Sequence, residues 1–152
     1  NSVEGVQLAL VEYNRLVGLV KARFAGLTDG PSGYAFSSTF QDDALIAYGC
    51  EGVALAFEWH YESVNTLDSS ALTVKLCDVE LFGRFTPDRN RSRVYATGRF
   101  HFTQGQTNEY GWAPTKSRSD FISGEVLLEI WLKQFLTKIQ EVKLRRQAER
   151  IR

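Results

Sequence analysis

Apolar residues recur at helical spacing near the start of the chain. They lie alternately three and four positions apart, which places them along one stripe of an α-helix. The stripe consists of Val3, Val6, Leu10, Tyr13, Val17, Val20 and Phe24. Ser2 is the expected N-cap and Gly26 the expected stop. Further apolar residues widen this surface, so we expect the helix to pack on a sheet and to meet a partner helix.

The middle of the chain follows a different period, in which apolar and polar residues alternate as they do in β-strands. The clearest stretch runs from Val53 to Glu62, where every odd position is apolar and the even positions end in Glu58, His60 and Glu62. A change of parity predicts either a bulge near Leu76 or a strand covered on both faces. With turn residues between them, the expected strands are residues 34–40, 44–48, 53–61, 71–82, 94–103 and 109–113.

A second helical pattern follows, with Ser119 or Asp120 as its expected N-cap. Its apolar stripe consists of Leu128, Trp131, Leu132, Phe135, Leu136, Ile139 and Val142. Beyond Val142 the tail at 143–152 becomes basic while keeping a few apolar residues at helical spacing. We expect this tail to project from the domain into solvent, or to contact a partner subunit or an anion.

These elements predict an α+β fold in a single domain spanning residues 1–152. An antiparallel meander of about six strands is covered on one face by the N-terminal helix and the long C-terminal helix. The final helix laid across a meander is similar in element order to the helix-grip, START-type ligand-binding domains. The strand that those domains place before their first helix is missing here. The resemblance implies a domain that binds a ligand.

Composition narrows the class of protein. The chain has 152 residues, of which 43% are hydrophobic and 24% charged, as in one ordinary globular domain. It contains no run of apolar residues long enough to span a membrane. The two cysteines, Cys50 and Cys77, are too few for a disulfide scaffold, so we expect buried thiols in a cytoplasmic protein. No sequence motif indicates a cofactor or a bound metal.

Polar side chains of two predicted strands form the candidate site. If the strands at 53–61 and 94–103 belong to one sheet, their polar faces gather a ligand-binding set made up of Glu58, His60, Glu62, Tyr95, Arg99 and His101. Both histidines of the chain belong to this set. Imidazole beside carboxylate can act in acid–base catalysis near neutral pH, so His60, His101, Glu58 and Glu62 are also the catalytic candidates. The same alternation is typical of a solvated sheet with cross-strand ion pairs.

Charge is distributed unevenly although its sum is zero. Residues 1–83 carry 11 acidic and 4 basic residues, a net charge of −7, and residues 84–152 carry 7 acidic and 14 basic residues, a net charge of +7. The arginines at 84–93 and those of the tail suggest nucleic acid as a partner. Three functions therefore stay open: a non-catalytic module that binds a small ligand or a protein and forms homo-oligomers, a small His/Glu enzyme, and a nucleic-acid binder.

Overall fold

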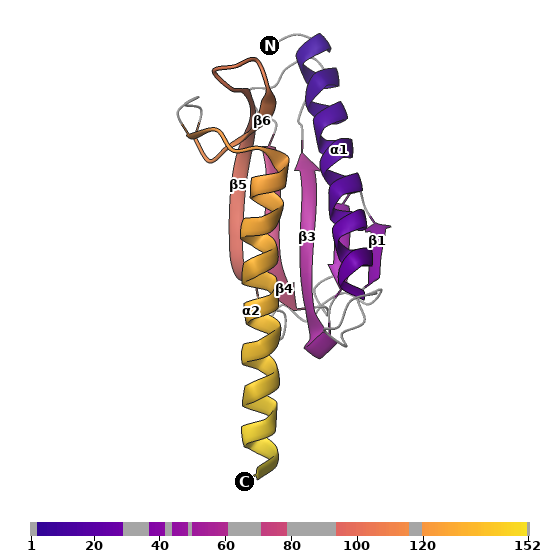
Figure 1. Ribbon diagram of the computed structural model, residues 1–152, viewed down its shortest axis with the longest axis vertical. Helices are drawn as coiled ribbons and strands as arrows, with labels where there is room; N and C mark the ends of the chain where they lie inside the picture. The colour runs from indigo at the N-terminus through magenta and orange to yellow at the C-terminus, as the bar shows by residue number, and fades with distance from the viewer. Residues whose placement is uncertain are drawn as a thin grey trace.

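The computed structural model describes residues 3–28, 37–41, 44–48, 50–60, 71–78, 94–115 and 120–151. Two long helices enclose the strands in sequence, one before them and one after (Figure 1). The elements are α1 (Val3–Thr28), β1 (Ser37–Gln41), β2 (Ala44–Tyr48), the short 3₁₀ turn η1 (Cys50–Gly52), β3 (Val53–His60), β4 (Ala71–Asp78), β5 (Val94–Gln104), β6 (Tyr110–Ala113) and α2 (Gly124–Ile151).

The strands follow one another across the sheet, and each is antiparallel to the next. Short connections permit this arrangement because antiparallel neighbours need no crossover. Side chains are described along four of the strands, β3 to β6. The predicted α+β class, with an antiparallel sheet flanked by two helices, is confirmed.

Both helices cover the same face of the sheet (Figure 1). Directly paired residues of antiparallel strands point to the same face, and the pairs on the helix-covered face are apolar. Three of these pairs join β3 to β4: Leu55 with Leu76, Phe57 with Val74, and Trp59 with Leu72. All six side chains are buried. This face supplies the floor of the hydrophobic core.

Helix α1 buries the predicted stripe from Val6 to Phe24, apart from Leu10. The side chain of Val3 and the expected N-cap Ser2 lie outside the described residues. Leu10 is 44% exposed, and Ala9 is buried in its place. The helix does not stop at Gly26 but continues to Thr28. One buried hydrogen bond ties α1 to the sheet, because the Tyr13 hydroxyl donates to the carbonyl oxygen of Phe57 at 2.8 Å.

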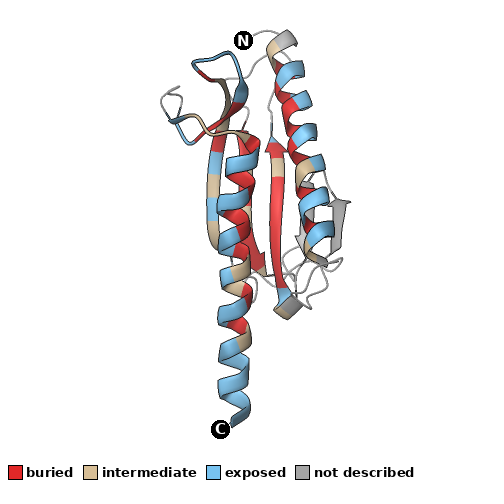
Figure 2. Ribbon diagram, in the orientation of Figure 1, coloured by how far each residue is buried: buried red, intermediate tan, exposed pale blue. Residues whose placement is uncertain are grey.

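Helix α2 begins later than expected, at Gly124, and Asp120 does not cap it. Ser119, the other expected cap, lies outside the described residues. The cap is Ser123, whose hydroxyl accepts a hydrogen bond from the backbone N–H of Val126 at 3.2 Å. Ser123 can reach this position because Ile122 is held in a bridge with Trp112 of β6. The buried side of α2 ends at Val142, and the residues beyond it are mostly exposed (Figure 2).

Candidate functional site

The sheet face opposite the helices carries most of the predicted polar set. Glu58 on β3 lies opposite Thr73 of β4, and Thr73 lies opposite Arg99 of β5. His60 lies two positions after Glu58 on β3, and His101 lies two positions after Arg99 on β5. Residues two positions apart on a strand point to the same face, so both histidines lie on this face. The structure therefore brings Glu58, His60, Arg99 and His101 to one surface. Glu62 lies outside the described residues.

Glu58 is the centre of this surface. Its Oε2 atom lies 3.1 Å from His60 Nε2 and 3.2 Å from Lys75 Nζ. Its side chain is only 12% exposed, so the two nitrogen groups replace much of the water that a carboxylate needs. The pair of His60 and Glu58 has the geometry in which a carboxylate orients an imidazole. Among the predicted acid–base candidates, this is the pair within hydrogen-bond distance in the described structure.

Lys75 was not predicted as a site residue, although its position in the sequence indicates that its side chain points away from the core. It is the only charged residue between Ala71 and Cys77 in a strand that is otherwise apolar or small. Such a residue has to point away from the core, and the register then places it on the face that carries Glu58. Only the pairing of β3 with β4 could identify Glu58 as its partner.

The two histidines are not adjacent. His60 lies opposite Ala71, and β4 lies between the strands that carry His60 and His101. Two strand spacings of about 4.8 Å separate their backbones by about 10 Å. Within the described ranges, no three His, Cys, Asp or Glu side chains are arranged to hold a metal ion.

Tyr95 is the exception in the predicted set, because it points toward α2. The register of β4 with β5 shifts between Leu76 and Cys77, where Leu76 pairs with Ala96 and Cys77 pairs with Val94. Tyr95 is the extra residue, so β5 has a bulge there. The shift in pairing beside Leu76 confirms the bulge that was expected near that residue. The shift breaks the alternation that placed Tyr95 beside Arg99. That part of the prediction is wrong.

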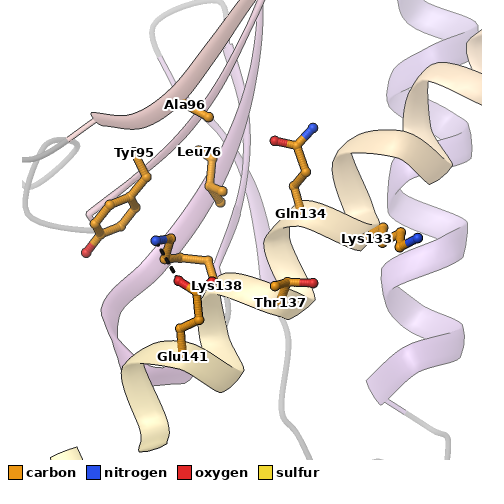
Figure 3. Close-up of a pocket in the computed structure, with 8 residues that line it drawn as sticks. All are labelled: Leu76, Tyr95, Ala96, Lys133, Gln134, Thr137, Lys138 and Glu141. Atoms are coloured by element: carbon orange, nitrogen blue, oxygen red, sulfur yellow. Dashed lines mark hydrogen bonds and ion pairs between the residues drawn. The ribbon is translucent and has the colours of Figure 1, made fainter. Parts of the chain in front are cut away.

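A cleft of about 320 Å³ lies between α2 and the start of β5. Its residues are Leu76, Tyr95, Ala96, Lys133, Gln134, Thr137, Lys138 and Glu141 (Figure 3). The sheet contributes an apolar floor and the Tyr95 ring, and the helix contributes polar groups. The sequence pattern could not reveal this cleft, because it depends on the bulge and on how α2 crosses the sheet.

Lys138 organises the polar side of the cleft. Its ammonium lies 4.6 Å from the centre of the Tyr95 ring, within the range of a cation–π contact. It also donates to Glu141 at 2.8 Å. Since an ammonium carries three N–H donors, this hydrogen bond leaves donor capacity at Lys138. Lys133 points away from Tyr95 (Figure 3), so Lys138 is the cation that faces the ring.

A second hollow, of about 360 Å³, lies between the two helices. Ion pairs cross it: Arg15 contacts Glu125 at 2.5 Å, and Arg23 contacts Glu129 at 2.9 Å. The Arg15 guanidinium also pairs with Glu12. These hydrogen bonds, first to Glu12 and then to Glu125, raise the pKa of Arg15 above its usual value, and Arg15 in turn lowers the pKa of Glu125. These ion pairs join α1 to α2 beside the hollow.

Cys77 has no catalytic character. It is fully buried, and its thiol lies 3.8 Å from the carbonyl oxygen of Ala54. Burial is the main cause that raises the pKa of Cys77 to about 12. The thiolate is the nucleophilic form of cysteine, so a thiol that stays protonated at neutral pH cannot serve as a nucleophile. The prediction of a buried thiol at this position is confirmed.

Comparison of the chain with protein-family models, curated proteins and solved structures found no match in any of the three. The helix-grip resemblance therefore gains no support from them. In the part of the chain that the structure describes, no helix has both the length and the hydropathy required to cross a bilayer.

Proposed function

We propose that this chain is a non-catalytic binding module and that the cleft between α2 and β5 holds a small ligand. The observation that carries the proposal is the cleft itself, which joins an apolar floor to a cation held over an aromatic ring. Its volume of about 320 Å³ lies at the lower end of the range for small-molecule sites, roughly 300–1,000 Å³. As part of this proposal, the sheet is a continuous meander of six strands that supports the cleft.

The lining favours one ligand chemistry. Leu76 and Ala96 offer contact to an apolar body, while Lys138, Gln134 and Thr137 offer N–H and O–H donors to an acceptor. Glu141 already occupies one donor of Lys138. The preferred ligand is therefore a small amphipathic molecule with a carboxylate or carbonyl head that bonds to Lys138.

A titration with benzoate and octanoate, followed by ¹H–¹⁵N correlation spectra, tests this proposal. We expect amide shifts concentrated at Ala96, Thr137 and Lys138, and weaker ones with the neutral analogue benzyl alcohol. Ala96→Leu fills the cleft and should abolish these shifts. Lys138→Gln removes a charged hydrogen bond worth about 1.5–3 kcal/mol, so binding should weaken by about 10- to 100-fold.

Lys21→Gln is the matched control, since Lys21 is exposed on α1 and lies outside the cleft. It should bind as the wild type does. Shifts scattered over the whole surface, or shifts that persist in Ala96→Leu, would refute the proposed site.

The hydrogen bond between His60 and Glu58 supports a second candidate function, a small enzyme with His60 as general base. Its test is the hydrolysis of p-nitrophenyl acetate, compared with an equal concentration of imidazole. His60→Gln should remove any activity above that of imidazole, and His101→Gln should leave it unchanged. Equal activity in the two variants would count against this candidate.

The remaining proposals concern partners and setting. We propose that the chain folds as one domain and self-associates into a homo-oligomer. The buried free thiol of Cys77 supports a cytoplasmic setting. For nucleic acid, the arginine-rich stretch at 84–93 lies outside the described residues, so support comes from the basic end of α2 alone. Oligonucleotide binding that weakens with salt is its test.

A further inference from the structure

The wall of the cleft between α2 and β5 carries two charged groups of opposite sign in contact. Lys138 Nζ lies 2.8 Å from Glu141 Oε2. Figure 3 shows the Lys138 ammonium between the Glu141 carboxylate and the Tyr95 ring. Lys133, the other charged residue of the lining, points away from the ring. One cation and one anion therefore face a ligand that lies beside Tyr95.

Both groups keep hydrogen-bonding capacity for a ligand. The Lys138 side chain is 26% exposed, so its ammonium is held at the wall by Tyr95 and Glu141, and the Glu141 side chain is 59% exposed. The ion pair uses one oxygen atom of Glu141 and one N–H of Lys138. A carboxylate accepts several hydrogen bonds and an ammonium donates three. Lys138 can therefore donate to a ligand while Glu141 accepts from it.

A ligand with one charge uses only half of this pair. Its carboxylate, placed on Lys138, would lie beside the carboxylate of Glu141, and like charges that lie so close repel each other. An ammonium placed on Glu141 would meet Lys138 in the same way. A ligand that carries both charges avoids these contacts, because each of its groups lies against the protein group of opposite sign.

The spacing of the pair narrows the choice of head group. Because Lys138 and Glu141 are in contact, the two charges of the ligand also have to lie close together. In an α-amino acid the ammonium and the carboxylate are attached to the same carbon atom. The side chain leaves that carbon in a different direction, and Leu76 and Ala96 offer it an apolar floor.

We propose that the ligand of this cleft is a free α-amino acid with an apolar side chain, an inference that rests on the small-ligand function proposed above. Its carboxylate accepts from Lys138, and its ammonium donates to Glu141. Its side chain packs on Leu76 and Ala96. A residue within a peptide does not meet these requirements, because an amide bond at either end removes one of the two charges.

Three compounds with the same phenylethyl skeleton test the head group. L-phenylalanine carries both charges, hydrocinnamate lacks the ammonium, and phenethylamine lacks the carboxylate. Each is titrated into the full chain at neutral pH and followed by ¹H–¹⁵N correlation spectra, with the amides of Ala96, Thr137 and Lys138 as reporters. We expect L-phenylalanine to bind about twofold to fivefold more tightly than either analogue, in keeping with one additional exposed ion pair.

Glu141→Gln separates the two charges, since it removes the anion and keeps the size of the side chain. We expect this variant to bind L-phenylalanine about twofold to fivefold more weakly. It should bind hydrocinnamate more tightly, because no carboxylate then competes for Lys138. Glu149→Gln is the matched control, since it makes the same change at an exposed position of α2 outside the cleft. It should leave all three affinities unchanged.

The outcomes separate this inference from the proposed function. If hydrocinnamate binds the wild-type cleft as tightly as L-phenylalanine does, the amino-acid head group is wrong and the small-ligand cleft stands. The same conclusion follows if Glu141→Gln changes both affinities in the same direction. If none of the three compounds shifts the reporter amides, or if the shifts persist in Ala96→Leu, both proposals are wrong.

Discussion

Gly98 lets α2 lie close to the sheet, and its replacement by alanine measures how tightly the two pack. Gly98 pairs with Val74 on the helix-covered face of β5. A Cβ built there would lie 2.6 Å from Cζ2 of Trp131 on α2 and 2.9 Å from the Phe100 ring. Carbon atoms prefer separations of about 3.5–4.0 Å. One of the two rings, or the helix itself, must therefore move by about 1 Å.

The expected magnitude follows from two opposing effects. Overpacking a filled core typically costs about 1–3 kcal/mol. Replacing glycine inside a strand returns about 0.5–1 kcal/mol, because glycine loses more conformational freedom on folding. Gly98→Ala should therefore lower the free energy of unfolding by up to about 2.5 kcal/mol. Urea denaturation followed by circular dichroism measures this change as a lower midpoint with an unchanged slope.

Gly18→Ala is the matched control. It makes the same substitution at an exposed position of α1 where nothing lies within 4 Å of the new Cβ. We expect it to stabilise the protein by about 0.5–1 kcal/mol, since alanine favours helix over glycine. Trp131→Leu, combined with Gly98→Ala, completes a double-mutant cycle, and contact predicts a coupling of at least about 0.5 kcal/mol. A stabilising Gly98→Ala, or a cycle without coupling, would show that α2 does not approach β5 as described.

Three further predictions test other contacts. Tyr13→Phe removes the buried hydrogen bond to the Phe57 carbonyl and should cost about 0.5–1.5 kcal/mol in urea denaturation; no change would mean that this bond is not formed. Arg15 lowers the folded-state pKa of Glu125, so the pair stabilises the fold above the usual carboxyl pKa, and this contribution is lost as pH falls through the lowered value. Glu125→Gln should flatten that part of the pH–stability profile below about pH 4.5, and an unchanged profile would contradict the pairing. Cys77, with its raised pKa, should resist iodoacetamide at pH 8 until the protein unfolds, and peptide mapping by mass spectrometry would reveal any labelling of the native state.

The candidate sites show how far sequence patterns carry. Period-two alternation correctly placed Glu58, His60, Arg99 and His101 on the face away from the helices, because alternation is a local property of a strand. It failed for Tyr95, since a single bulge reverses the face of the residue at which it occurs. The parity change near Leu76 predicted that a bulge exists, but the inserted residue lies on β5, and only the strand pairing identifies it.

By itself the sequence determined the class of fold, because the period of apolar residues depends on local backbone geometry. It fixed which stretches become helices and strands, and it predicted most of the stripe by which α1 packs. Tertiary structure decided what depends on residues far apart in the chain. It pairs Lys75 with Glu58. It makes Ser123 the N-cap of α2, because Ile122 is held against Trp112. It also forms the cleft where α2 crosses β5. Register and helix placement set these contacts, and neither is encoded in the spacing of neighbouring residues.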